Sequence, residues 1–353
     1  MSIRTWLWVL AVAGSISPVA AQPVPTSFTF GAAGDFKFGE QFKATAAAVK
    51  AQKPDFLVAL GDFSYKGDEQ AWCQVWKQGV NQPVVLITGN HDSGEEGAGA
   101  GNINEYVKHC QVPSGIAWTG EYGKQYYFDY PAIKPLARFI LVSPGVKGSF
   151  LGSPYNERDY YQVGHKGYQF TADAIDEARA NGIEWIFVAM HKNYISVLEK
   201  KNEISRDKNN SFMTMLLDKK VDIILQGHEH GYERSKQLTT VPKTCPVLKP
   251  EPAQFDPDCV SDSDDTLVKG AGTVIHVIGT GGKELRSIDP TDPERQYFAK
   301  TDIKSYGFGK FVVTPDSVSF TFQPSSGTLT DSYTITKAAL PPVEPVPASP
   351  PGH

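Results

Sequence analysis

Five apolar segments of this 353-residue chain run directly into side chains that can bind metal ions, and in four of them a glycine comes first. Residues 28–33 run into Gly34-Asp35, 56–60 into Gly61-Asp62-Phe63-Ser64-Tyr65, 84–88 into Gly89-Asn90-His91-Asp92, 185–190 into His191, and 223–226 into Gly227-His228-Glu229-His230. In open α/β sheets, ligands collect at the carboxyl ends of the strands. The pattern therefore predicts that these polar side chains meet in one site.

Apolar runs alternate with amphipathic stretches along most of the chain, which favours an α/β fold. Strands are predicted at 28–33, 55–61, 83–89, 138–142, 184–190, 222–226 and 273–278, and helices at 40–52, 68–78, 103–110, 171–180 and 210–219. Residues 307–313 and 317–322 flank Pro315-Asp316 and predict a hairpin. The long irregular stretches 143–167 and 238–270 are expected to be surface excursions. No repeat or break in composition interrupts the chain, so we expect one catalytic domain over 22–339.

The predicted site has a donor set that suits two metal ions: Asp35, Asp62, Tyr65, Asn90, His191, His228 and His230. A carboxylate such as Asp62 can bridge two cations through its two oxygens. Carboxylate and phenolate oxygens favour hard ions, whereas imidazole and amide groups suit divalent transition ions. Two metal ions about 3.5–4 Å apart can hold a phosphoryl group and lower the pKa of a bound water molecule.

The ordered motifs GD, GDxxY, GNHD, VxxH and GHxH resemble those of the calcineurin-like metallophosphoesterases, and the tyrosine of GDxxY is similar to that of the purple acid phosphatases. The resemblance extends from Asp35 to Gly282. It implies a β-sandwich of two mixed sheets flanked by helices, in four layers, with a dimetal site at the strand C-termini. The short length is similar to that of the small, tartrate-resistant-like class.

The resemblance also implies a role for each residue of the site. Asp35, Tyr65 and His230 match ligands of a ferric ion, Asn90, His191 and His228 match ligands of Fe(II), Zn(II) or Mn(II), and Asp62 matches the bridging ligand. His91 matches a histidine that contacts the phosphate and protonates the leaving group. The implied enzyme is an acid phosphatase that hydrolyses phosphate monoesters, on small molecules or phosphoproteins, with a metal-bound hydroxide as the nucleophile.

The chain departs from the family pattern in two places. Lys37 stands where the family usually has the second glycine of GDxG, and we expect it to point away from the metal ions or to bind substrate phosphate. No histidine follows His191 within the next several residues, where the family often has another in the substrate pocket, so Lys192 or Asn193 is a candidate replacement. Asn90, His91, Lys37 and Lys192 are therefore the predicted substrate contacts.

Two other functions fit the same residues. A metallophosphodiesterase that acts on cyclic nucleotides or glycerophosphodiesters would keep the site and change the substrate. A non-catalytic exported metal-binding protein would keep the ligands for stability alone, but such a protein has no need of His91 beside an open metal centre. A nucleic-acid partner is not expected, because 34 basic and 39 acidic residues give a net charge of −5.

The chain termini and the cysteines indicate export. Residues 1–21 have the features of a signal peptide, with Arg4 before a short apolar run and small residues before a cleavage site near Ala21. Residues 340–353 form a proline-rich tail. Four cysteines allow three disulfide pairings, and their spacing favours Cys73–Cys110 and Cys245–Cys259. We therefore expect a secreted or periplasmic protein without an integral membrane span, because no apolar run is long enough to cross a bilayer.

Overall fold

A computed structural model describes residues 26–94, 100–147, 160–199, 204, 211–248 and 255–338 of the chain. The predicted signal peptide and the proline-rich tail lie outside the described residues, as do residues 148–159 of the irregular stretch 143–167. Within the described part, no helix is long and apolar enough to cross a membrane.

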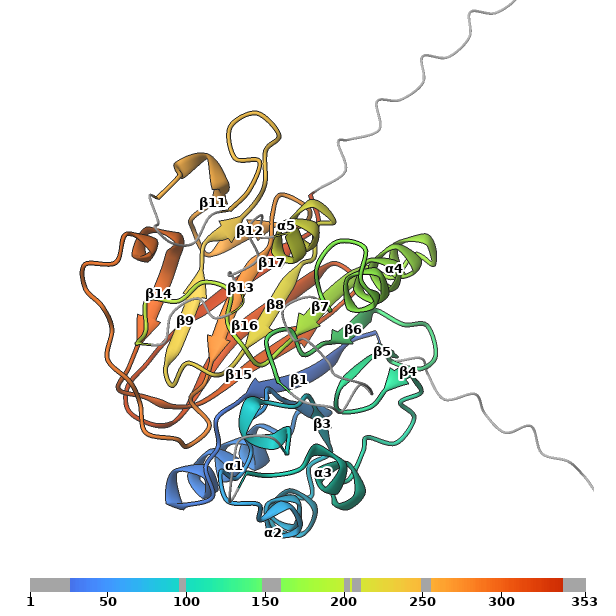
Figure 1. Cartoon of the computed structure of the whole chain (residues 1–353), viewed down its shortest axis with the longest axis vertical. Coiled ribbons are helices and arrows are strands. Elements are labelled where there is room, and N and C mark those ends of the chain that lie inside the picture. Colours follow the sequence, from blue (N-terminus) through green and yellow to red (C-terminus); the bar gives the residue numbers. More distant parts are fainter. Residues whose placement is uncertain are drawn as a thin grey trace, which may run out of the picture.

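Two mixed sheets make up the centre of the molecule (Figure 1). The first has the strand order β12 (Thr266–Val268), β17 (Ser332–Thr336), β16 (Ser317–Ser326), β15 (Tyr306–Val313), β1 (Phe28–Ala33), β2 (Phe56–Ala59) and β3 (Val84–Leu86). The second has the order β14 (Phe298–Asp302), β9 (Tyr232–Ser235), β13 (Val274–Ile278), β8 (Ile223–Gln226), β7 (Trp185–Ala189), β6 (Ala137–Leu141), β5 (Gln125–Tyr130) and β4 (Trp118–Glu121). β1, β2 and β3 are parallel, and so are β6, β7, β8 and β13.

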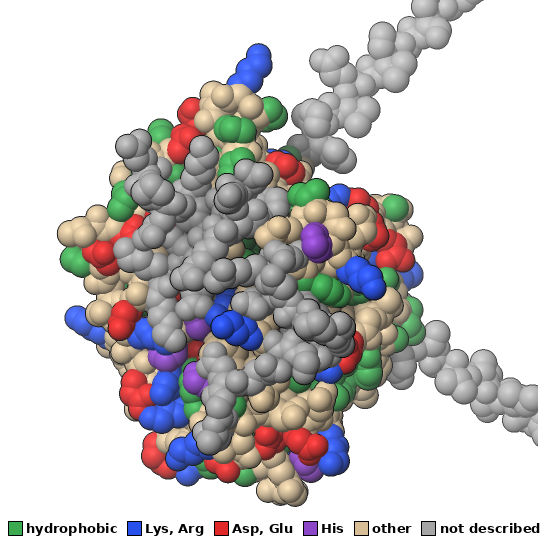
Figure 2. Space-filling model, in the orientation of Figure 1, with side chains coloured by type: hydrophobic (Ala, Val, Ile, Leu, Met, Phe, Trp, Pro, Cys, Tyr) green, Lys and Arg blue, Asp and Glu red, His purple; other side chains and the backbone are tan. Residues whose placement is uncertain are grey.

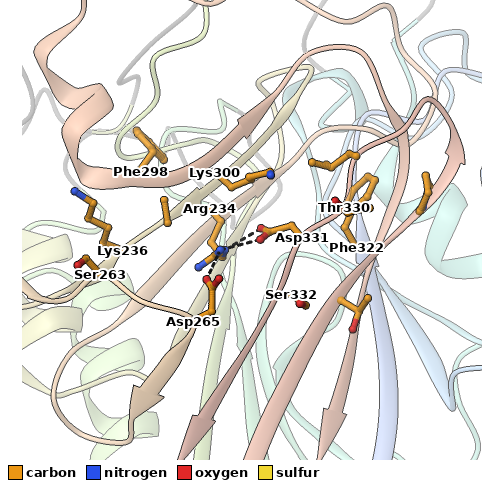
Figure 3. A pocket seen from close by; sticks show the side chains of 14 residues that line it. Arg234, Lys236, Ser263, Asp265, Phe298, Lys300, Phe322, Thr330, Asp331 and Ser332 are labelled. Atoms are coloured by element: carbon orange, nitrogen blue, oxygen red, sulfur yellow. Dashed lines mark hydrogen bonds and ion pairs between the residues drawn. The ribbon is translucent and has the colours of Figure 1, made fainter.

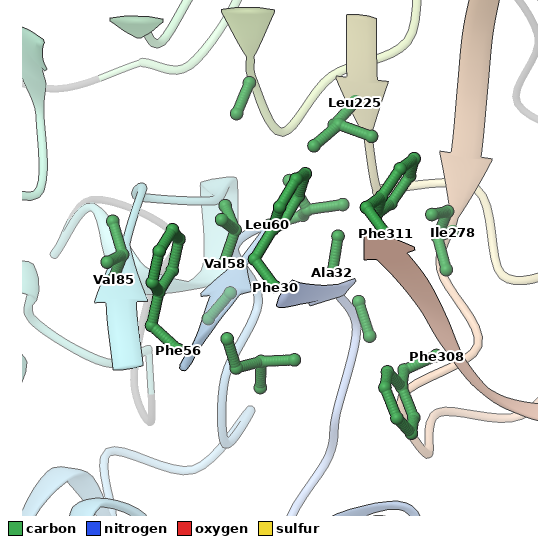
Figure 4. Packing of buried hydrophobic residues seen from close by; sticks show 14 of the residues in the cluster. Phe30, Ala32, Phe56, Val58, Leu60, Val85, Leu225, Ile278, Phe308 and Phe311 are labelled. Carbon is green, nitrogen blue, oxygen red and sulfur yellow. The ribbon is translucent and has the colours of Figure 1, made fainter. Parts of the chain in front are cut away.

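The sheets pack face to face through large aromatic side chains. Phe30 of β1 stacks on Phe311 of β15 at 4.6 Å between ring centroids and meets Phe139 of β6 edge-on at 4.9 Å. Figure 4 shows this layer, with side chains of both sheets interleaved. Ile140 and Val188 face the other way, into a second core. This alternation follows from the two-residue period of a strand.

Helices cover the outer faces of the sheets (Figure 1). The α-helices are α1 (Glu40–Gln52), α2 (Glu69–Gln74), α3 (Ile103–His109), α4 (Lys166–Ala180) and α5 (Ser211–Asp218). α1 packs against β15 and β16, whereas α4 packs against β6 and α5. Short 3₁₀ helices form at Asn90–Asp92, Pro257–Cys259 and Pro293–Tyr297, and β10 (Gln237–Leu238) pairs with β11 (Val260–Asp262). The predicted α/β sandwich flanked by helices is confirmed.

Several boundaries differ from the sequence prediction. The helix expected at 68–78 is an α-helix only to Gln74 and continues as a π-helix over Val75–Val80. The helix expected from 171 begins at Lys166, one turn earlier. The stretch 238–270, expected to be irregular, contains β11 and β12. The predicted hairpin is present, and its second strand extends to Ser326.

Both expected disulfides are present. Cys73–Cys110 joins α2 to the end of α3, with its Cα atoms 4.7 Å apart, and Cys245–Cys259 closes a loop beside β11, with its Cα atoms 5.3 Å apart. The first bridge ties together the two helices that follow the Asp62–Tyr65 loop and the Asn90–Asp92 turn. Disulfides of this kind are typical of proteins that fold in an oxidising compartment.

Candidate metal centre

The seven predicted ligands come from five loops at the carboxyl ends of strands. Asp35 follows β1, Asp62 and Tyr65 follow β2, Asn90 follows β3, His191 follows β7, and His228 and His230 lie between β8 and β9. The first three strands belong to one sheet and the others to the second, so the centre lies where the carboxyl ends of both sheets meet. Figure 2 shows histidines beside Lys and Arg side chains near the middle of one face.

Tight backbone turns bring the loops together. Asp35, Asp62, Tyr65 and His228 all have left-handed backbones, with φ of 59°, 54°, 63° and 69°. A non-glycine residue in this region is uncommon and marks a constrained site. Gly89 makes the close approach feasible, since a Cβ atom there would lie 2.2 Å from Asp62 Oδ1. A larger residue at this position would push the carboxylate out of the centre.

One half of the centre contains Asp35, Tyr65 and His230. The Tyr65 hydroxyl donates to Asp35 Oδ1 at 2.9 Å and lies 3.2 Å from His230 Nε2, and His230 Nε2 lies 3.5 Å from Asp35 Oδ1. Burial and the neighbouring carboxylates raise the pKa of the Tyr65 phenol well above its usual value. Burial, reinforced by the Asp62 charge, also raises the pKa of Asp35 to about 6, although the His191 charge opposes this. The Tyr65 hydroxyl, Asp35 Oδ1 and His230 Nε2 thus lie within 3.5 Å of one another.

The other half contains Asp62, His191, His228 and Asn90. His191 Nε2 lies 3.2 Å from Asp62 Oδ1, 3.1 Å from Asn90 Oδ1 and 3.2 Å from His228 Nδ1. One ligand atom each from Asp62, His191 and His228 falls within 4.8 Å of the others, a spacing that can hold a metal ion. Burial opposes ionisation of Asp62, but the charge and hydrogen bond of His191 outweigh it and hold the Asp62 pKa well below its usual range.

Backbone carbonyls orient two of the imidazoles. His191 Nδ1 donates to the Leu60 carbonyl at 2.7 Å, and His230 Nδ1 donates to the Glu284 carbonyl at 2.9 Å. Each Nε2 is thereby turned toward the other predicted ligands. A hydrogen bond from the second ring nitrogen is the usual way in which proteins orient a metal-binding histidine. Burial and the nearby Arg286 charge lower the pKa of His230 to about 3, so its imidazole is neutral at physiological pH.

His91 lies at the open side of this group. Its backbone N–H donates to Asp62 Oδ1 at 2.9 Å, its Nε2 lies 3.9 Å from Asp62 Oδ2, and its ring packs over Tyr65 with the centroids 4.5 Å apart. Its side chain is 32% exposed, whereas His191 is fully buried. The imidazole is therefore within reach of both the centre and solvent, as a group that exchanges protons with a substrate must be.

Asp92 supports the centre although the sequence pattern suggested no role for it. Its buried carboxylate accepts hydrogen bonds from the backbone N–H groups of Asp62 at 2.5 Å, Phe63 at 2.9 Å and Gly89 at 3.0 Å. It thereby joins the loop after β2 to the turn after β3. The only sequence signal was its place at the end of GNHD, which does not reveal these backbone partners.

The predicted substrate contacts of Lys37 and Lys192 have different surroundings. Lys37 Nζ forms an ion pair with Glu284, so its charge is directed at a carboxylate. Lys192 is half-buried and its stem lies against Gly145. Lys283 also pairs with Glu284, at 3.3 Å, and lies 4.7 Å from the centre of the Tyr65 ring. Lys37 and Lys283 therefore share one carboxylate at the edge of the centre.

Arg286 is a further neighbour that no motif indicated. Its guanidinium donates to Glu229 Oε1 at 2.9 Å and to the His228 carbonyl at 3.1 Å, and Nη2 lies 3.3 Å from His230 Nε2. Its backbone N–H also donates to the His230 carbonyl at 2.8 Å. Arg286 thus fixes the loop that carries both histidines. The structure brings all seven predicted ligands together, while their role in binding metal stays a prediction.

Comparisons with known proteins identify the family of this chain. The family model of the calcineurin-like phosphoesterases matches residues 28–232, more than half of the chain. The chain is 25% identical over 300 residues to probable inactive purple acid phosphatase 27 of Arabidopsis thaliana, which covers 80% of this chain and 43% of that protein. It is 23% identical over 274 residues to purple acid phosphatase 1 of Ipomoea batatas, covering 73% and 50% of the two proteins.

A solved structure has the same fold. Purple acid phosphatase PPD1 of yellow lupin superposes with a TM-score of 0.63 at 16% identity, over 90% of this chain and 55% of that one. This likeness confirms the metallophosphoesterase fold expected from the sequence motifs. The chain spans about half the length of these relatives.

Proposed function

This chain belongs to the calcineurin-like phosphoesterase family, and we propose that it is an acid phosphatase that hydrolyses phosphate monoesters at a dimetal centre. The observation that carries the proposal is the convergence of Asp62, His191 and His228 at strand ends, beside a second group of donors made by Asp35, Tyr65 and His230. Two adjoining donor groups that share a carboxylate suit a pair of metal ions.

The residues fit the two ions in chemistry as well as in position. Asp35, Tyr65 and His230 offer oxygen and imidazole donors to a ferric ion, and Asn90, His191 and His228 suit Fe(II), Zn(II) or Mn(II). Asp62 interacts with Tyr65 of the first group and with His191 of the second. When bound, the ions supply Lewis acidity that activates water and neutralises charge on the phosphoryl oxygens. The chain supplies oriented imidazoles, a dense set of acceptors and the carboxylate that joins them.

His91 acts in this proposal as the acid that protonates the leaving oxygen. Its exposed ring edge can reach a substrate outside the centre, while its backbone bond to Asp62 Oδ1 fixes it beside the phosphoryl position. General acid catalysis is most important when the leaving group is a poor one. Asn90, on the same turn, would orient the substrate.

Lys37 contributes little to substrate binding in this proposal. Its ammonium forms an ion pair with the Glu284 carboxylate, which cancels much of its attraction for phosphate. Of the two roles expected from the sequence, this contact favours the one in which Lys37 points away from the metal ions. Among the described residues around the centre, none favours a diester over a monoester, and an assay on both esters separates the two activities.

The test of the metal centre is a visible absorption spectrum and a metal analysis of protein made without residues 1–21, with Tyr65→Phe as the control. A purple band that is absent from the control, with two metal ions per chain including iron, is the expected result. Two colourless metal ions would leave a metallophosphoesterase with another metal pair. Fewer than two ions per chain after reconstitution would overturn the proposal.

The test of the activity is the ratio of turnover on p-nitrophenyl phosphate to turnover on bis(p-nitrophenyl) phosphate. We expect the monoester to be preferred, and a preference for the diester would assign the alternative activity. One of the relatives is named a probable inactive phosphatase. Fully metallated protein without turnover on either ester would therefore place this chain among non-catalytic metal-binding proteins.

Export is the remaining part of the proposal. The two disulfides support it, since such bonds persist in oxidising compartments. Mass spectrometry of the mature protein should give an N-terminus at Gln22, after removal of a signal peptide that ends near Ala21. A mature cytoplasmic protein that keeps Met1 would contradict secretion.

A further inference from the structure

A pocket of about 590 Å³ lies away from the metal centre, where β9 and β14 of one sheet meet β16 and the start of β17 of the other (Figure 3). None of the seven predicted metal ligands is among its lining residues. Its volume is in the range that binds small organic molecules in proteins. We call it the Arg234 pocket, after the buried residue in its wall.

Hydrogen bonds to two carboxylates fix Arg234 in this wall, and its Nη1 group is not used in them. Its Nε donates to Asp331 Oδ2 at 2.8 Å, and its Nη2 donates at 2.8 Å to both Asp331 Oδ1 and Asp265 Oδ1. Although Arg234 is only 3% exposed, Nη1 forms no hydrogen bond with any described residue. Figure 3 shows the guanidinium with one edge on the two carboxylates and the other turned away from Asp331.

Two half-buried lysines add positive charge around the same space. Lys300 lies on β14 and Lys236 directly follows β9, and both line the pocket. Neither forms an ion pair with a carboxylate of the described residues, and the Lys236 ammonium lies over the Phe255 ring at 5.6 Å. Both carboxylates of the lining are already bound by Arg234. The pocket is therefore locally basic in a chain whose net charge is −5.

The rest of the lining is apolar or carries hydroxyl groups. Phe298, Phe322, Pro324 and Leu329 provide apolar surface, and Ser263, Thr321, Thr330 and Ser332 provide hydroxyls. An inorganic anion would leave the apolar surface unused, whereas a neutral apolar molecule would leave the cations without a partner. From these features we infer that the Arg234 pocket binds a small organic anion, with one carboxylate or phosphate group toward Arg234 and Lys300 and an apolar body against Phe298 and Phe322.

This inference is tested by calorimetric titration of the metal-loaded full chain with 2-naphthoate, at low ionic strength and with saturating orthophosphate to occupy the metal centre. We expect one additional site per chain, whose affinity falls as salt is added because its charges are partly exposed. The neutral analogue 2-naphthamide should bind at least about fivefold more weakly, since it lacks the charge that Arg234 and Lys300 recognise. Equal binding of the two probes, or no saturable binding, would overturn the inference.

A matched pair of variants locates the site. Lys300→Glu reverses a charge in the lining, whereas Lys304→Glu makes the same change at an exposed lysine that does not line the pocket. We expect naphthoate affinity to fall about tenfold or more in Lys300→Glu, with little change in Lys304→Glu. Phosphatase turnover should be the same in both. Equal loss of affinity in the two variants would mean that naphthoate senses only overall charge, and the pocket would not be its site.

Discussion

Two polar clusters in this molecule have opposite arrangements of charge. The metal-centre cluster, defined by the seven predicted ligands, contains carboxylates, imidazoles and a phenol that approach one another within 2.9–3.5 Å, and Arg286 lies at its edge with Nη2 3.3 Å from His230 Nε2. The Arg234 cluster, defined by Tyr232, Arg234, Asp265 and Asp331, has a guanidinium between two carboxylates and a tyrosine hydroxyl on one of them at 2.6 Å.

The difference separates a cluster suited to binding cations from one whose carboxylates are already bound by a cation of the protein. Burying a hydrogen-bond acceptor without a partner costs free energy. A cluster of such atoms, which are also electron-pair donors to metals, can therefore bind a cation favourably. A buried arginine that pairs with two carboxylates has most of its hydrogen-bond donors and its charge already matched. Removing one partner leaves a buried charge without compensation. Changes in the first cluster should therefore affect metal and turnover, whereas changes in the second should affect stability.

The largest expected effect is that of Asp62→Ala. Loss of the carboxylate between the two donor groups should remove metal binding and lower turnover by at least about 10³-fold. Metal analysis and steady-state hydrolysis measure both effects. The free energy of unfolding of the metal-free variant, measured by thermal denaturation, should differ from that of the metal-free parent protein by less than about 2 kcal/mol. Full activity would exclude the dimetal mechanism. A large loss of stability would show that the metal-centre cluster, like the Arg234 cluster, stabilises the fold.

Asp331→Ala should have the opposite effect to Asp62→Ala, lowering stability and leaving the metal centre intact. Asp331 bridges the two sheets, because it lies just before β17 and pairs with Arg234 of β9. Its removal should lower the free energy of unfolding by about 3–5 kcal/mol in urea titrations and leave two bound metal ions. The control is Asp265→Ala, because Asp265 binds the same guanidinium but is 66% exposed, and it should cost at most about 1 kcal/mol. Similar costs for the two variants would show that burial does not set the strength of this clamp.

His91→Ala sharpens the comparison within the metal centre. The variant should keep both metal ions and lose about 10²-fold in turnover on alkyl phosphates, with a smaller loss on p-nitrophenyl phosphate. A series of phenyl phosphates with leaving groups of increasing pKa measures the slope. If good and poor leaving groups lose the same factor, His91 is not the general acid.

The smallest expected effect concerns pH and His276, which packs beside the Arg234 cluster. Burial and the Arg234 charge lower the pKa of His276 to about 3, against about 6.5 in an unfolded chain. Between these values the unfolded chain binds a proton that the folded chain does not, so the free energy of unfolding decreases by about 1.4 kcal/mol for each unit by which the pH is lowered. His276→Phe should lose this part of the acid sensitivity, seen in urea titrations at about pH 7 and about pH 5. An unchanged pH dependence would rule out the titration of His276 as its source.

Much of the fold could be predicted because its central strands carry strong signals. β1, β2, β7 and β8 are almost continuously apolar, since each is buried on both faces. β9 gave no such signal, because Tyr232–Ser235 reads as a polar stretch and is buried only through the partners of Arg234 and Glu233. Such a strand becomes visible only when residues distant in sequence are known to pair with it.

The residues of the site also differ in whether the sequence alone could reveal them. The convergence of the seven candidate ligands could be predicted because each follows a strand, and the parallel strands of each sheet bring their carboxyl ends to one place. Arg286 and Glu284 could not, since they lie in a loop without a motif and reach the centre through contacts with His228, His230 and Lys37. Lys37 shows the limit most clearly, because the sequence left two roles open and a residue 247 positions away decides its contact.

The left-handed turns at Asp35 and Asp62 have a consequence for how the protein is assembled. Hydrogen bonds between the loops hold these turns: the Asp35 N–H donates to the Gly61 carbonyl at 3.0 Å, and the Phe36 N–H donates to the Asp62 carbonyl at 3.0 Å. The folded chain itself therefore fixes the geometry of the turns. Under the proposed function the order of events is then free: the chain can fold and close its disulfides before a metal ion binds, and an ion that is lost can be replaced without refolding. The metals found in a purified sample would then record the supply where the finished protein last resided.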